Sequence, residues 1–141
     1  MTKAKIFTTL ATVFIISVSK PVLAGGDVSS PLATWDTSGS TTFLASSTLP
    51  GTLTVTDTCV WLEFSDTTDK LLLVWPEPTS WNAETGEITA VDYQGDTTVL
   101  KAGDVMTAGG AAATSNAPYV IAPDPACEAK MVWLVNEVVL E

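Results

Sequence analysis

The chain contains no histidine and no arginine. Without histidine there is no imidazole to act as the base of a nucleophilic triad, to bind a metal, or to change charge near neutral pH. Without arginine there is no guanidinium to grip phosphates or carboxylates with two parallel hydrogen bonds. We therefore predict no catalytic residue, no metal ligand and no cofactor of these classes.

Positive charge is scarce as well. The chain has six lysines and sixteen acidic residues, for a formal charge of −10. Three of the lysines precede residue 24, so the remaining 117 residues set three lysines against all sixteen acids, a charge of −13. Such a field repels phosphate backbones and anionic headgroups. Nucleic acid and acidic membranes are excluded as expected partners.

The first 24 residues have the pattern of a secretory signal peptide. Lys3 and Lys5 precede an apolar run over 6–18, and Val22, Leu23 and the small Ala24 follow. The run is about thirteen residues, shorter than the roughly twenty that cross a bilayer as a helix. An uncleaved anchor is the competing interpretation, but no charged stop-transfer flank follows. We expect a periplasmic or secreted protein with no transmembrane segment after cleavage and, because no cysteine lies at the cut, no lipid there.

The chain has only two cysteines, Cys59 and Cys127. In an exported protein the oxidising compartment makes pairing the default, so we predict a disulfide. In the chain-entropy model a loop of this size contributes roughly 4 kcal/mol of stability. A pair of free reactive thiols is the alternative, although no neighbouring cation is evident that would lower either pKa.

The mature chain is long enough for one domain. Residues 25–50 are rich in Ser, Thr and Gly and predict an ordered arm or a linker. The pair Pro50 and Gly51 predicts a turn, after which the composition shifts to β-branched and aromatic residues. We therefore expect the compact domain to span 51–141.

Short alternating or apolar runs predict strands throughout this domain. The firmest is a hairpin in which 87–93 pairs with 97–101 across a turn at Gly95. Gly109 and Gly110, followed by alanines, predict a flexible stretch or weak helix. These runs favour an all-β fold, a small antiparallel barrel or a sandwich of six to seven short strands with one disulfide. The predicted strands are 52–56, 59–64, 70–75, 87–93, 97–101, 105–108 and 131–140, and a shorter apolar run covers 119–121.

A set of residues between 51 and 140 resembles a loose group of small exported bacterial domains, often lipoproteins, of undescribed function. The resemblance implies an OB-like or related β-barrel carrying the disulfide, and it implies no reaction. The chain differs from the lipoprotein members because it has no cysteine at the signal cut. The shared elements are Gly51-Thr52-Leu53, Cys59, Val74-Trp75-Pro76, Trp81, Gly103-Asp104-Val105, Gly109-Gly110 and Cys127 before a closing apolar strand.

Four tryptophans fall within this domain. Trp75 and Trp133 lie in the most apolar runs and are expected in the core. Trp61 shares one face of its strand with Cys59, and the sequence does not settle which face is buried. Trp81 lies in a segment with proline, serine and asparagine, where a loop can present an aromatic side chain to a partner. We take Trp81 and Trp61 as candidate ligand contacts, while a tryptophan that only covers a barrel end is the alternative for Trp81.

Two acidic groups suggest other chemistry. Asp66 and Asp69 lie close enough to suggest calcium, although the spacing is not an EF-hand and a solvated turn explains it more simply. Carboxylates such as Glu84 and Asp92 could serve glycoside hydrolysis only if two faced each other across a cleft. We therefore expect a non-catalytic binding or interaction module of the bacterial envelope, with an unknown protein or glycan as partner. The alternatives are a small carboxylate-dependent hydrolase acting on glycans and a purely structural secreted component.

Overall fold

A computed structural model describes residues 30–38 and 47–141, and these residues form ten β-strands and no helix. The predicted all-β fold is confirmed, with more strands than expected because three strands, β1, β5 and β9, have only three residues. The predicted signal peptide lies outside the described residues. The strands are β1 (Ala33–Trp35), β2 (Ser47–Val55), β3 (Val60–Glu63), β4 (Lys70–Pro76), β5 (Ser80–Asn82), β6 (Glu87–Val91), β7 (Thr97–Lys101), β8 (Val105–Ala112), β9 (Tyr119–Ile121) and β10 (Val132–Leu140).

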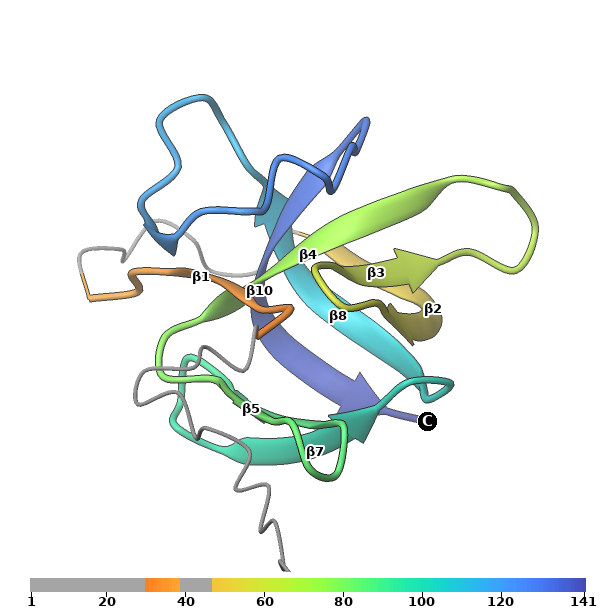
Figure 1. Ribbon diagram of the computed structural model, residues 1–141, viewed down its shortest axis with the longest axis horizontal. Helices are drawn as coiled ribbons and strands as arrows, with labels where there is room; N and C mark the ends of the chain where they lie inside the picture. The colour runs from red at the N-terminus through yellow and green to blue at the C-terminus, as the bar shows by residue number, and fades with distance from the viewer. Residues whose placement is uncertain (1–29, 39–46) are drawn as a thin grey trace, which may run out of the picture.

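Seven strands form one sheet in the order β10-β8-β2-β3-β4-β1-β9. Because β10 also pairs with β4, the pairings from β4 through β3, β2, β8 and β10 return to β4 and close a ring of five strands. Strands β5, β6 and β7 form a second sheet, which lies below the larger one in Figure 1. Most pairings are antiparallel as predicted, but β4 runs parallel to both β1 and β10. A parallel pair needs a long connection, and more than 50 residues separate β4 from β10.

The main core lies between the two sheets. In β6 the alternation predicted from the sequence places Ile88 and Ala90 in this core, and β7 adds Leu100. The hairpin of β6 and β7 has the predicted register, with Ile88 opposite Leu100. Other members of the main core come from the larger sheet and include Leu53, Leu62, Leu73, Trp75, Met106, Trp133 and Val135.

Both faces of β3 are buried, which answers the question that the sequence left open. Val60 and Leu62 enter the main core, whereas Trp61 packs beside the disulfide. The predicted disulfide between Cys59 and Cys127 is confirmed, with the two Cα atoms 5.8 Å apart. Such bonds are typical of proteins in oxidising compartments.

Pro50 and Gly51 do not form the predicted turn, because β2 runs straight through them. Proline cannot donate to a β-ladder, but β2 pairs with β3 only from Thr52 onward, so on that edge no β3 partner faces Pro50. The next residue, Gly51, has no room for a side chain. A Cβ at Gly51 would lie 2.6 Å from the carbonyl oxygen of Glu63.

Gly109 and Gly110 also lie in a strand, β8, and not in the predicted flexible stretch or helix. A Cβ at Gly110 would overlap the carbonyl oxygen of Leu134 on β10. The glycine therefore permits the close approach of two backbones. The sequence did not predict this strand because the requirement for glycine at 110 comes from β10, more than 20 residues further along the chain.

The folded unit extends N-terminal to residue 51, where the sequence predicted the domain to start. Strand β1 pairs with β4 and β9, and its Trp35 is 2% exposed. The indole Nε1–H of Trp35 donates a 2.8 Å hydrogen bond to the carbonyl oxygen of Val135. A three-residue strand is too short to produce a periodic pattern, so only its partners reveal it.

Candidate functional site

Trp81 lies in a short strand, β5, and not in a loop. It pairs with Ile88 of β6, packs partly against the main core and keeps part of its side chain exposed. Two adjoining hollows, of about 690 and 420 Å³, both have Trp81 in their lining. Hollows of this size are in the range of small-molecule and glycan-sized sites. We call them together the Trp81 hollow.

The larger part of the Trp81 hollow is built from four strands. Thr34 comes from β1, and Leu32 lies immediately before that strand. Strand β9 contributes Ile121. The remaining lining from β5, β6 and their neighbours is mostly hydroxyl and amide, namely Thr79, Ser80, Asn82 and Thr89, with Glu84 as the acid. Sequence reasoning missed Leu32 and Thr34 because they fall in the segment taken as an arm or linker.

Local hydrogen bonds fix the polar part of this lining. The side-chain oxygen of Asn82 accepts hydrogen bonds from the backbone N–H of Glu84 at 3.0 Å and Thr85 at 3.3 Å. Gly86 closes the same turn with φ +70°, a conformation that glycine adopts without strain. Thr79 accepts a hydrogen bond from the backbone N–H of Val91 at 3.1 Å. Hydrogen bonds between side-chain oxygens and backbone N–H groups therefore hold the polar lining beside Trp81 in place.

Thr34 is 4% exposed, and within residues 30–38 and 47–141 its hydroxyl oxygen has no hydrogen-bond partner. Buried hydroxyl groups are nearly always hydrogen-bonded. Its residue lines the Trp81 hollow. The hydroxyl oxygen itself is buried, so Thr34 contributes to the wall of the hollow without presenting this group at its surface.

Trp61, the second candidate contact, is 5% exposed. It packs against the disulfide and Leu72, and the Lys70 ammonium lies 4.1 Å from the centre of its ring. This is well within the range of a cation–π interaction. Trp61 therefore presents little surface to a ligand, and it does not line the Trp81 hollow.

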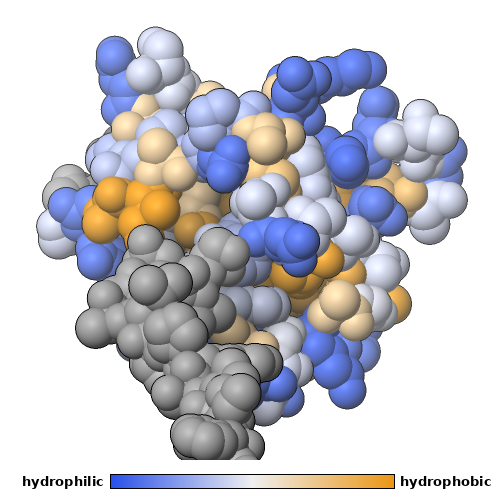
Figure 2. Space-filling model, in the orientation of Figure 1, coloured by the Kyte–Doolittle hydropathy of each residue, from blue (hydrophilic) through white to orange (hydrophobic). Residues whose placement is uncertain are grey.

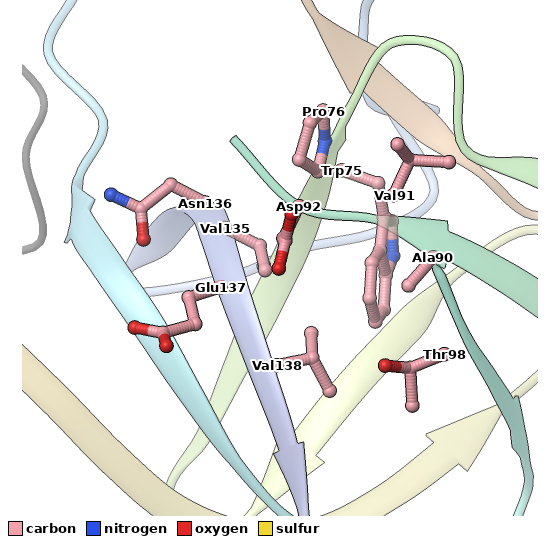
Figure 3. A pocket seen from close by; sticks show the side chains of 10 residues that line it. All are labelled: Trp75, Pro76, Ala90, Val91, Asp92, Thr98, Val135, Asn136, Glu137 and Val138. Carbon is pink, nitrogen blue, oxygen red and sulfur yellow. The ribbon is translucent and has the colours of Figure 1, made fainter. Parts of the chain in front are cut away.

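The acidic residues proposed for glycoside chemistry lie in turns. Asp92 accepts hydrogen bonds of 2.8 Å from the backbone N–H groups of Gln94 and Asp96, which closes the β6–β7 turn. Asp92 and Glu137 both line a small hollow, shown in Figure 3, whose volume is about 10 Å³. That is room for about one water molecule and far too little for a sugar ring. Nothing in this hollow supports the hydrolase alternative.

The Asp66–Asp69 region is a turn as well. The hydroxyl of Thr67 accepts a 3.2 Å hydrogen bond from the backbone N–H of Asp69, and the Asp69 carboxylate lies 3.6 Å from the Lys130 ammonium. In the described part of the chain no three acidic or cysteine side chains are grouped so that they could hold a metal ion. The same residues include no helix of the length and apolarity that a membrane crossing needs.

Two ionisable groups near β1 have shifted pKa values. Hydrogen bonds from the side chain and backbone of Ser38 lower the pKa of Asp36, just after β1. Burial raises the pKa of Tyr119, which pairs with Trp35 from β9. Neither group lines the Trp81 hollow. Both lie in or next to β1 and β9, the paired strands that form one wall of the hollow.

A comparison with protein-family models, curated proteins and solved structures finds no match to this chain.

Proposed function

We propose that this protein is an exported, non-catalytic binding module of the bacterial envelope, acting in the periplasm or outside the cell. Its contact surface is the Trp81 hollow, and its partner is a glycan. The observation that carries the proposal is the placement of Trp81. It is the part-exposed indole shared by both parts of the hollow.

A tryptophan held on a strand is a rigid platform. Trp81 is fixed by pairing with β6 and by packing against the main core, so little conformational entropy is lost when a ligand covers its exposed face. Aromatic rings of this kind contact the apolar C–H face of a sugar and anchor interfaces.

The lining also suits a neutral polar ligand. Hydroxyl and amide groups outnumber charged ones around the hollow, and no lysine borders it. Such groups can exchange hydrogen bonds with sugar hydroxyls in either direction. An anionic ligand would find only the carboxylates of Glu84 and Asp57 here, which repel it.

The test compares wild type with Trp81→Ala and Trp81→Phe for binding to purified peptidoglycan and an array of immobilised bacterial glycans. Trp81→Ala should weaken binding at least tenfold, and Trp81→Phe should retain part of it. Because Trp81 packs partly on the core, the alanine variant should also lose about 1 to 3 kcal/mol of stability. Binding is therefore measured well below its melting temperature.

The matched control is Tyr93→Ala, because Tyr93 is an aromatic residue that is 52% exposed in the turn between β6 and β7. It should bind as wild type does. Equal binding by Trp81→Ala and wild type would remove this surface from the proposal. Wild type that bound none of the glycans would favour a protein partner or the purely structural alternative.

A further inference from the structure

A second hollow, of about 590 Å³, lies on the side of the disulfide. One wall is the end of the β3–β4 connection and the start of β4, at 68–71. The other wall is the segment 128–131, which leads into β10. Phe64 and Leu49 complete the lining. We call this hollow the lysine groove, for the reason given next.

Two of the three lysines that follow residue 24 border this groove, Lys70 and Lys130. They are 60 residues apart in sequence and meet because β10 runs beside β4, with Val132 opposite Leu72. The third, Lys101, lies at the end of β7. In a region of charge −13, the groove therefore holds two of the three lysines, beside the two acids Asp69 and Glu128.

The floor of the groove is apolar. Leu71 is 4% exposed, and Phe64 and Leu49 are half-buried and pack against the main core. Met131 stands at the rim and is 46% exposed. A flexible thioether of this kind adapts to apolar ligands of varied shape.

Figure 2 shows one face of the molecule, where hydrophilic residues cover the projecting loops and apolar residues gather in separate patches.

The two walls of the groove are held in position by contacts within the protein, so the groove exists without a ligand. Cys127 immediately precedes one wall and is bonded to Cys59, which lies just before β3. Ala129 packs into the disulfide cluster, and the carbonyl oxygen of Met131 accepts a 3.2 Å hydrogen bond from the backbone N–H of Leu72. A preformed groove spares a ligand the cost of ordering it.

The charges of the rim select the ligand. Lys70 is held above Trp61, and Lys130 makes a 3.6 Å contact with Asp69 in which both side chains are largely exposed. An exposed pair at that distance is worth little, so a ligand carboxylate can replace Asp69. Asp69 and Glu128 also border the groove. They make a singly charged anion a better match than a doubly charged phosphate.

We propose that the lysine groove binds an amphipathic monoanion, a single apolar chain that ends in a carboxylate, as in a fatty acid. The chain lies over Leu71, Phe64 and Met131, and the carboxylate lies between the ammonium groups of Lys70 and Lys130. This site is separate from the Trp81 hollow and does not depend on the glycan proposal.

The test measures dodecanoate binding to the exported, disulfide-bonded protein by calorimetry, below the concentration at which dodecanoate forms micelles. The double variant Lys70→Gln, Lys130→Gln should bind at least tenfold more weakly, and Lys101→Gln should match wild type within twofold. All three lysines are exposed, so the loss of the Lys70 contact with Trp61 and of the Lys130 contact with Asp69 should lower the unfolding free energy by only about 1 kcal/mol, and the variants should stay folded. Dodecyltrimethylammonium, with the same chain and opposite charge, should bind at least tenfold more weakly than dodecanoate.

Three results would overturn the proposal. The first is no dodecanoate binding by wild type, and the second is equal binding by the double variant. The third is equal affinity for the cationic amphiphile, which would mean that the groove recognises only the chain. Trp81→Ala should bind dodecanoate as wild type does, so failure here and failure of the glycan proposal are separable.

Discussion

The Trp81 hollow and the lysine groove differ in nearly every property that governs recognition. The first is lined by hydroxyl and amide groups around one part-exposed indole, and no lysine borders it. The second has an apolar floor with two lysines at its rim. The first is walled by β1, β5, β6 and β9, and the second by β4 and the segment after Cys127.

The difference teaches how a small, acidic chain without histidine or arginine can recognise two kinds of ligand. A neutral polar partner needs no positive charge, so the Trp81 hollow can lie among acids. An anionic partner must overcome repulsion from the whole domain, so the few lysines are concentrated at one place. The disulfide holds one wall of the lysine groove and touches the Trp81 hollow only at Thr56, so its removal should affect the two sites unequally.

The largest effect is expected from replacing both cysteines, Cys59→Ser with Cys127→Ser. The loop they close spans 68 residues, so in the chain-entropy model the variant should lose about 4 kcal/mol of unfolding free energy, measured by urea denaturation. Under conditions where the variant is still folded, dodecanoate binding should fall because one wall of the lysine groove is released.

Glycan binding by the same folded variant should fall less than dodecanoate binding, since the larger part of the Trp81 hollow shares no residue with the disulfide cluster. The smaller part is joined to that cluster only through Thr56, whose hydroxyl accepts a 3.0 Å hydrogen bond from the backbone N–H of Cys59. A parallel loss of both activities would show that the two sites are not independent. A stability loss below about 1 kcal/mol would show that the unfolded chain is already constrained by other means.

A smaller effect is expected from Ile88→Ala. Ile88 is fully buried in the main core and lies opposite Trp81 in the β5–β6 pair. Removing its side chain should cost about 2 to 4 kcal/mol and loosen the strand that carries Trp81. Glycan binding should weaken while dodecanoate binding by the folded variant is retained.

The control is Val99→Ala on β7, where the side chain is 53% exposed. A surface change of this kind should alter stability by no more than about 0.5 kcal/mol. If Ile88→Ala left glycan binding intact, the position of Trp81 would not depend on β6, and the rigid-platform argument would be wrong.

The parts of this fold that sequence could predict are local. The β6–β7 hairpin is encoded by alternation and a turn at Gly95, whose φ is +86°. The disulfide was predicted from the expected signal peptide and a count of two cysteines. In both cases the deciding information lies in the segment itself or in the composition of the chain.

The parts that sequence could not predict are set by distant partners. Pro50 is tolerated because β3 has already ended, and Gly110 is required by the backbone of Leu134. Trp81 lines a hollow and stays a candidate contact, and its strand was not predicted because three residues carry no period. Lys70 and Lys130 border the same groove because β4 and β10 lie side by side, which the sequence does not indicate.

The smallest expected effect concerns Tyr119 in β9, whose strip with β1 walls the Trp81 hollow and not the lysine groove. Burial raises the pKa of Tyr119 above its ordinary value of about 10. A raised pKa means that the unfolded state ionises first. The stability that Tyr119 contributes is therefore complete below pH 10 and is lost as the pH rises from there through the folded pKa.

The chain has only two tyrosines, so in a Tyr93→Phe variant the phenolate absorbance reports Tyr119 alone. Its midpoint should lie above 10 in the folded protein and fall to the ordinary value in urea. Glycan binding should decline over this same pH range, because ionisation favours release of β9 from β1. A midpoint equal to that in urea would mean that the strip is not packed in solution as it is here, and the wall of the Trp81 hollow would then have to form on binding.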